Sequence, residues 1–121
     1  MDWKFDDTRP IWLQLTERLT LSIVTGVYPP GSRLPSVREL AAEAGVNPNT
    51  MQRALAQLEA DGLAVGGRTA GRTVTEDAAA MNAVRRRLAR ENADIYLAAM
   101  ASLGYTRAEA VKLLEEDTND E

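Results

Sequence analysis

The chain lacks the side chains that most often carry out catalysis. It contains no histidine and no cysteine, so the commonest general base, the commonest zinc ligand and any thiolate nucleophile are absent. We find no P-loop, no paired-carboxylate motif and no acidic spacing typical of a metal site. The sequence therefore predicts a protein that is not an enzyme and that carries neither cofactor nor metal.

The remaining polar side chains are suited to binding phosphates or the edges of bases. Arginine holds phosphates and can donate two hydrogen bonds to guanine, and amide or hydroxyl side chains make similar contacts. Such residues are grouped in one stretch of the chain. They are Arg33, Ser36, Arg38, Asn47, Asn49, Thr50, Gln52, Arg53, Arg68 and Arg72, with Gly71 beside the last of them.

The charge of the 121-residue chain is unevenly distributed. The formal net charge is −4, which at first argues against nucleic acid as a partner. Residues 1–75 contain 8 basic and 8 acidic side chains, whereas residues 76–121 contain 6 basic and 10 acidic ones. A neutral first part can still bind DNA if its arginines converge on one face.

The spacing of apolar residues predicts a helix-turn-helix. A helix from Pro10 to about Gly26 would bury Trp12, Leu15, Leu19 and Ile23, and a short extended piece would cover residues 32–34. Ser36 and Glu39 form a capping box for a second helix that ends at Gly45. Asn47 and Pro48 open a third helix, which ends at Asp61 and Gly62. Its inward face would be Met51, Ala54, Leu55 and Leu58.

The next segments predict a hairpin and two more helices. Extended runs at 63–65 and 72–74 flank a glycine-rich loop, which is typical of a wing. A long helix is expected over residues 76–103, where no Pro or Gly occurs. Thr106 and Glu109 form a second capping box, which opens a helix that continues through Leu114.

Three runs of residues carry a resemblance to a known family. They are Pro29-Pro30-Gly31-Ser32-Arg33-Leu34-Pro35-Ser36-Val37-Arg38-Glu39-Leu40-Ala41, Gly45-Val46-Asn47-Pro48-Asn49-Thr50 and Leu58-Glu59-Ala60-Asp61-Gly62. These runs resemble the GntR family of bacterial transcription regulators. The resemblance spans about residues 8–75, and the short C-terminal part resembles the YtrA subfamily. The family wing commonly reads Gly-x-Gly-Thr-Phe-Val, of which this chain keeps Gly71 and Val74. The resemblance implies a mainly α (α+β) fold. It comprises a winged helix-turn-helix DNA-binding domain over residues 1–75 and a two-helix dimerisation region over residues 76–121.

Each predicted DNA contact has a purely structural alternative. The third helix is expected to enter the major groove by its N-terminal end, and the resemblance implies that Arg38 contacts a base or phosphate. Arg33 and Arg38 could instead be solvated, Arg38 could pair with a nearby acid, and Arg53 could form a salt bridge on the helix surface. Ser36 and Asn47 serve as helix caps in either case.

Two helices alone cannot bury both of their faces, so we expect the C-terminal part to pack against a second copy. The alternative is packing against its own winged domain. Arg85, Arg86 and Arg87 could extend the DNA footprint, but basic runs on long helices are more often solvated. The residues predicted to form the dimer contact are Met81, Val84, Leu88, Ile95, Met100, Leu103, Val111 and Leu114.

Together these features predict a cytoplasmic, dimeric repressor that binds double-stranded operator DNA and controls a nearby operon, which the resemblance suggests encodes a transporter. Neither a membrane span nor a signal peptide is recognisable in the sequence. The alternative function is a winged-helix protein-interaction module without specific DNA binding. The sequence leaves open whether a small effector pocket exists at the dimer interface, and it identifies no effector.

Overall fold

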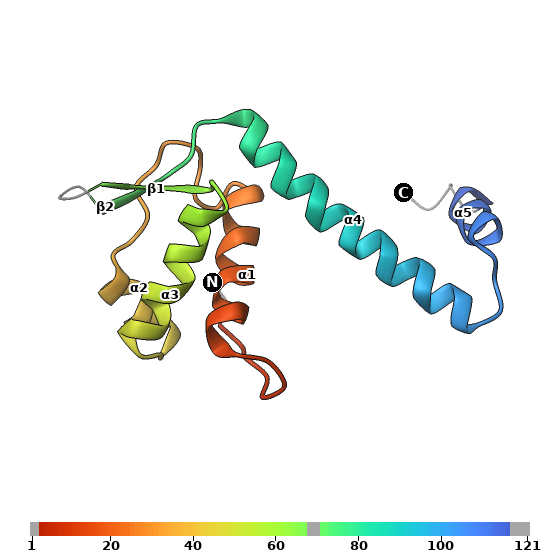
Figure 1. The fold of residues 1–121 in the computed structure, drawn as a ribbon, viewed down its shortest axis with the longest axis horizontal. Helices are drawn as coiled ribbons and strands as arrows, with labels where there is room; N and C mark the ends of the chain where they lie inside the picture. The colour runs from red at the N-terminus through yellow and green to blue at the C-terminus, as the bar shows by residue number, and fades with distance from the viewer. Residues whose placement is uncertain (1–2, 68–70, 117–121) are drawn as a thin grey trace. The chain divides into compact units, whose positions relative to one another are not determined.

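The computed structural model describes residues 3–67 and 71–116, and Arg68 of the predicted wing lies outside this part of the chain. Its described contacts divide the molecule into two compact units that meet between Val84 and Arg85. The elements follow the order predicted from the sequence (Figure 1). They are α1 (Ile11–Val24), α2 (Val37–Ala44), α3 (Pro48–Ala60), β1 (Ala64–Gly67), β2 (Gly71–Val74), α4 (Ala78–Ser102) and α5 (Arg107–Glu116).

The core of the first unit is formed where α3 packs against α1 and α2. The predicted inward face of α3 is confirmed, because Met51, Ala54, Leu55 and Leu58 are all at most 1% exposed. Helical spacing on α1 likewise buries Leu15, Leu19 and Ile23, whereas Trp12 is only half-buried. This apolar contact holds α3 in place and turns its polar face outward.

The helix caps form as the sequence predicts. The Ser36 amide donates to Glu39 Oε1 over 2.8 Å, and the Glu39 amide donates to Ser36 Oγ over 3.1 Å. Gly45 ends α2 with φ of +71°, a left-handed conformation that glycine adopts without strain. Asn47 Oδ1 then accepts from the Asn49 amide at 2.7 Å. These caps fix the turn between α2 and α3.

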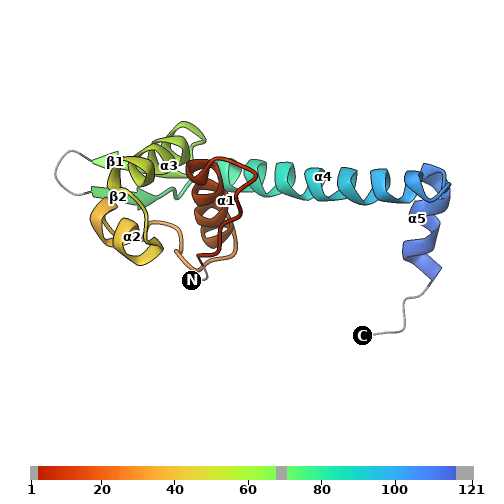
Figure 2. The same cartoon turned by 90° about the horizontal axis from the view of Figure 1, so that it is seen from below.

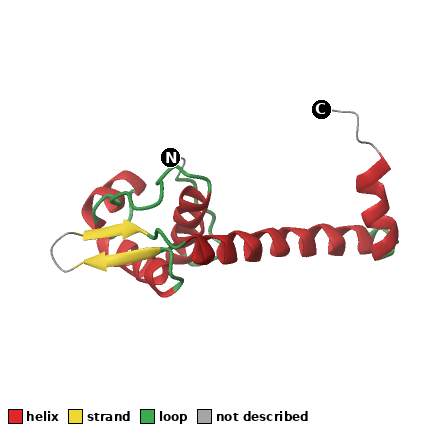
Figure 3. Ribbon diagram, turned by 90° about the horizontal axis from the view of Figure 1, so that it is seen from above, coloured by secondary structure: helices red, strands yellow, loops and turns green. Residues whose placement is uncertain are grey.

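The wing is an antiparallel hairpin of two strands (Figure 3). In its register Gly66 lies opposite Arg72 and Gly67 opposite Gly71. Segment 31–34, which includes the extended piece predicted over residues 32–34, follows the other edge of β2. Its backbone bonds are Gly31 N to Val74 O at 2.9 Å, Val74 N to Ser32 O at 2.8 Å, and Leu34 N to Arg72 O at 2.9 Å. These bonds bring the start of α2 beside the wing.

Helix α4 begins at Ala78, two residues later than predicted. The reason is a local cap: the Thr75 hydroxyl accepts from the Asp77 amide, and the Asp77 carboxylate accepts from the amides of Ala79 and Ala80. The start of α4 belongs to the first unit.

The second unit contains the remainder of α4 and the shorter α5, which follows a turn at Gly104 (Figure 2). The predicted capping box is present, because Thr106 and Glu109 exchange amide bonds of 2.9 and 3.1 Å. Met100 and Ala110 are buried, and the Tyr96 hydroxyl donates to the Ala110 carbonyl at 2.8 Å. None of the described helices has both the length and the apolarity needed to cross a membrane.

Candidate nucleic-acid interface

The N-terminal end of α3 presents polar side chains that the fold does not use. Asn49 and Gln52 are exposed and Thr50 is half-buried. Within the described part of the chain, these three side chains have neither a hydrogen bond nor an ion pair. Amide and hydroxyl groups in this state can exchange water for the edges of bases without breaking a protein contact. The predicted reading end of α3 is therefore available to a ligand.

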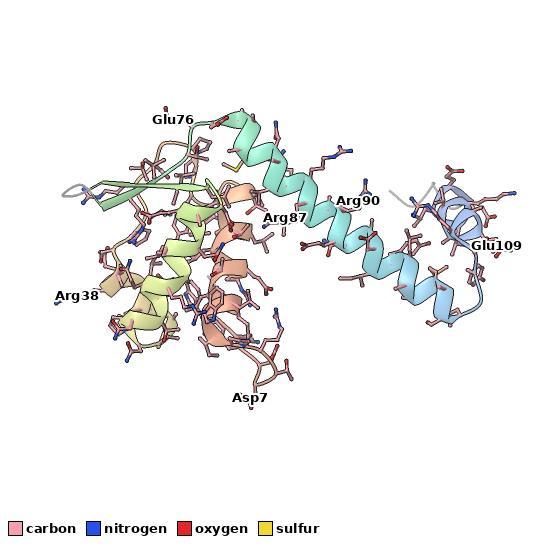
Figure 4. All side chains as sticks on the ribbon, in the orientation of Figure 1. Asp7, Arg38, Glu76, Arg87, Arg90 and Glu109 are labelled. Atoms are coloured by element: carbon pink, nitrogen blue, oxygen red, sulfur yellow. The ribbon has the colours of Figure 1, made fainter. Side chains whose placement is uncertain are left out.

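Arg38 extends this surface from α2. Its side chain is exposed and points away from the neighbouring helices (Figure 4). It does not pair with an acid among the described residues, contrary to one alternative considered from the sequence. A guanidinium that is already solvated and unpaired loses little when it moves onto a phosphate or a guanine.

A groove of about 540 Å³ lies between the start of α2 and the wing. Arg33, Ser36, Gly71 and Arg72 line it, together with Glu39. The Ser36 amide and hydroxyl, with the charge of Arg33, lower the pKa of Glu39 below its usual value. The groove therefore contains the exposed Arg33 and the carboxylate of Glu39, which already accepts a hydrogen bond in the α2 cap.

Two of the predicted arginines are held by protein partners instead. The Arg53 guanidinium lies 4.1 Å from the ring centre of Trp12 on α1, a cation–π contact rather than the salt bridge considered from the sequence. Arg72 Nε donates to Glu59 Oε2 over 3.0 Å. Of the four predicted arginines that the structure describes, Arg33 and Arg72 line the groove, Arg38 lies on α2, and Arg53 faces α1.

Sequence reasoning did not identify Glu59 as part of this region. It lies 13 positions before Arg72, and neither helical nor strand periodicity relates the two. The register of the wing is what brings them together. The available signal was Gly66, which lies opposite Arg72 and leaves room for a side chain from outside the hairpin.

The predicted dimer contacts fall into two groups by exposure. Met81, Val84 and Met100 are buried within the described protein at 8%, 5% and 8% exposure, and Leu88 is half-buried. The other four are strongly exposed. They are Ile95 at 67%, Leu103 at 72%, Val111 at 43% and Leu114 at 63%.

Among the described residues, no group of three or more acidic side chains could hold a metal ion. The polar residues that are gathered in the first unit are those suited to nucleic acid, namely arginines, amides and hydroxyls on α2, α3 and the wing.

Known proteins share this arrangement. Residues 12–74 match the family described as bacterial regulatory proteins, gntR family. YhcF of Bacillus subtilis, described as an uncharacterized HTH-type transcriptional regulator, is 34% identical over 112 residues, which are 93% of each chain. The HTH-type transcriptional repressor YtrA of the same species is 38% identical over 69 residues, 57% of this chain and 53% of that one.

A solved structure agrees over both units. A GntR family transcriptional regulator from Listeria monocytogenes is 33% identical, with a TM-score of 0.84, over 94% of this chain and 100% of the other. The chain therefore belongs to the GntR family of bacterial regulatory proteins, and it is a transcriptional regulator with a DNA-binding winged helix-turn-helix.

Proposed function

We propose that the protein is a dimeric repressor that binds a two-fold symmetric operator by placing α3 of each protomer in the major groove. The observation that carries this proposal is the polar end of α3, where Asn49 and Gln52 are exposed and Thr50 is half-buried. Neither these side chains nor the neighbouring Arg38 bonds to another of the described residues. A major groove about 12 Å wide admits a helix with such side chains. Asn47 caps α3 and would also contact the DNA beside these residues.

Phosphate contacts would surround this reading end. Arg33 and the start of α2 at Ser36 face the groove beside the wing, and helix N-termini and arginines are common phosphate donors. The wing, including Gly71 and the basic residue Arg68, would contact the neighbouring backbone. Each phosphate that the protein neutralises makes binding more sensitive to salt.

The second unit supplies the proposed dimer contact. Its exposed apolar side chains are Ile95 on α4, Leu103 directly after α4, and Val111 and Leu114 on α5. Covering them with a second copy would remove them from water. Two reading helices about 34 Å apart, or a multiple of that spacing, would then match operator half-sites on one face of the duplex.

The proposed direction of control is repression, by occlusion of the promoter. The similarity to the repressor YtrA supports this direction. We propose an operon close to the regulator's own gene, encoding a transporter, as the target, and the cytoplasm as the compartment in which the operator is bound.

Fluorescence anisotropy tests the proposal directly. Full-length protein is titrated against a labelled duplex from its own promoter, and against a duplex that it selects from a random pool, at two salt concentrations with unrelated competitor DNA. We expect tight binding that resists the competitor and weakens steeply with salt.

Arg38→Ala should weaken this binding by about tenfold or more, since one good arginine contact is worth roughly 1–3 kcal/mol. Its thermal unfolding should not change, because Arg38 is exposed and unpaired among the described residues. Lys112→Ala on α5 removes the same charge and serves as the control. If the wild type selects no duplex from the pool, the protein-interaction module becomes the better assignment.

A further inference from the structure

Three residues from three elements meet at the outer half of the wing. Arg72 on β2 donates from Nε to Glu59 Oε2 on α3 over 3.0 Å, and Gly66 on β1 lies directly opposite Arg72 in the hairpin. A Cβ atom at Gly66 would collide with Glu59 Oε2. The missing side chain of Gly66 therefore makes room for the carboxylate that Arg72 holds.

This ion pair is better shielded than the Arg9–Glu17 and Arg87–Glu91 pairs. The side chains of Arg72 and Glu59 are 18% and 33% exposed, compared with 44% and 52% for Arg9 and Glu17. The pair on α4 between Arg87 and Glu91 is longer, at 3.9 Å, and more exposed. Partial burial reduces screening by water and salt, so the Glu59–Arg72 pair has a greater effect on geometry than an ordinary surface pair.

The outer half of the hairpin has few other side chains to hold it to α3. Leu63 and Val74, at 0% and 1% exposure, fix its root in the core. Further out, Val65 is 56% exposed and is followed by Gly66 and Gly67, which have no side chains. Segment 31–34 borders β2 by backbone bonds as far out as Arg72, where the Leu34 amide donates to the Arg72 carbonyl over 2.9 Å. These bonds hold β2 to that segment and not to α3. The Glu59 carboxylate supplies a side-chain contact between α3 and this part of the wing.

We propose that Glu59 and Arg72 are positioning residues, which with Gly66 fix the angle of the wing on α3 so that wing and helix engage the duplex together. This inference rests on the proposed function. It gives Arg72 a different role from the one predicted by sequence, because a guanidinium that holds Glu59 orients the wing rather than a phosphate. The competing arrangement is that Arg72 leaves Glu59 on binding and contacts the DNA backbone.

The two arrangements predict opposite effects of removing Glu59. If the pair positions the wing, Glu59→Ala and Arg72→Ala should each weaken binding by about threefold to tenfold, the loss of roughly one hydrogen-bonded contact. The double variant should be no weaker than either single one, because the two residues act as a unit. If Arg72 is instead a phosphate contact, Glu59→Ala should free it and bind as tightly as the wild type or more tightly.

The salt dependence gives a second distinction. Loss of one phosphate contact lowers the slope of log affinity against log salt by about 0.9, whereas loss of a positioning pair leaves that slope unchanged. Gly66→Ala should weaken binding as Glu59→Ala does, because the new methyl group displaces the carboxylate. The double variant Gly66→Ala, Glu59→Ala should bind as tightly as Glu59→Ala alone. Exchanging the pair, with Glu59→Arg and Arg72→Glu together, should recover most of the affinity.

The experiment measures anisotropy of the full chain on the duplex that the wild type selects from a random pool, with Glu115→Ala and Lys112→Ala on α5 as charge-matched controls. Amide hydrogen exchange of β1 and β2 is measured in the free protein, where we expect faster exchange in Glu59→Ala and Arg72→Ala. Affinity in Glu59→Ala equal to or above its control, additive losses, or unchanged exchange would overturn the inference. The exchange result stands without DNA, so it separates failure of this inference from failure of the proposed function.

Discussion

Ser36 shows that a single residue can stabilise the fold and also line the candidate binding surface. Its hydroxyl and amide are engaged by Glu39 in the α2 cap, yet it also lines the groove beside the wing. Arg53 is likewise engaged, over Trp12, whereas Arg38 and Gln52 are exposed and have no bonded partner among the described residues. A polar side chain without a protein partner is the one that can bind DNA at least cost.

The α2 cap predicts a pH dependence of stability. The Ser36 amide, its hydroxyl and the charge of Arg33 hold the pKa of Glu39 below its usual 4.5, so the folded state binds the proton more weakly than the unfolded state. The cap should therefore stabilise the fold fully above the usual pKa and lose its effect as pH falls through the lowered folded-state pKa. Thermal unfolding between about pH 6 and pH 3 measures this.

Glu39→Gln is the matched comparison, because a glutamine can accept the same amide bond without titrating. Its unfolding midpoint should fall less steeply with acid than that of the wild type. Equal slopes in the two proteins would show that the Glu39 carboxylate does not contribute to the acid dependence.

At the scale of elements, the wing depends on one backbone conformation at the end of its loop. Gly71 begins β2 with φ of +75°, a region that β-branched residues avoid. The same position faces the Arg33 guanidinium, since a Cβ there would lie 3.5 Å from Nη2. The hairpin geometry and the position of Arg33 are therefore coupled through a residue that has no side chain.

Gly71→Val should distort the wing and weaken operator binding by about tenfold, since the left-handed conformation costs a non-glycine residue roughly 1–2 kcal/mol. Gly71→Asn, which tolerates positive φ better, should retain more affinity. Anisotropy on the selected duplex checks this order. Wild-type affinity in Gly71→Val would mean that the wing does not take part in binding.

At the scale of the whole molecule, the two units have different apolar surfaces. The first buries its core residues among α1, α2, α3 and the root of the wing, and it includes Met81 and Val84 at the start of α4. The second buries Met100 and Ala110 but leaves Ile95, Leu103 and Leu114 more than 60% exposed. Those exposed residues lie in the unit proposed to form the dimer, where a partner would cover them.

Ile95→Glu and Leu114→Glu should each dissociate the proposed dimer, because a carboxylate would be buried in an apolar contact, and operator affinity should fall by about tenfold or more as the second half-site contact is lost. Protomer unfolding should change little, since both side chains are exposed. Sedimentation velocity of the full chain gives the oligomeric state. Leu21→Glu, at an exposed apolar position on α1, is the control, and an unaltered dimer in all three variants would move the interface elsewhere.

Local signals were sufficient to predict most of the fold and the exposure of the polar side chains Asn49 and Gln52 at the start of α3. Apolar spacing identified the buried face of α3, and the capping boxes at Ser36 and Thr106 located two helix starts. The exposure of Asn49 and Gln52 could be predicted because helical geometry alone turns them away from the buried Ala54 and Leu58. The start of α4 was placed two residues early, because the cap at Asp77 depends on Thr75 at the end of the wing.

The sequence by itself determined the order of the elements, the inward faces of the helices and the family, because periodicity, caps and turn residues act within a few positions of the chain. Only the tertiary structure decided which arginines are available. Arg53 meets Trp12 and Arg72 meets Glu59 through contacts between separate elements, and no local pattern encodes such distances. The partner of a charged side chain depends on how the helices and the wing pack, and packing also left Arg38 exposed and without a bonded partner among the described residues.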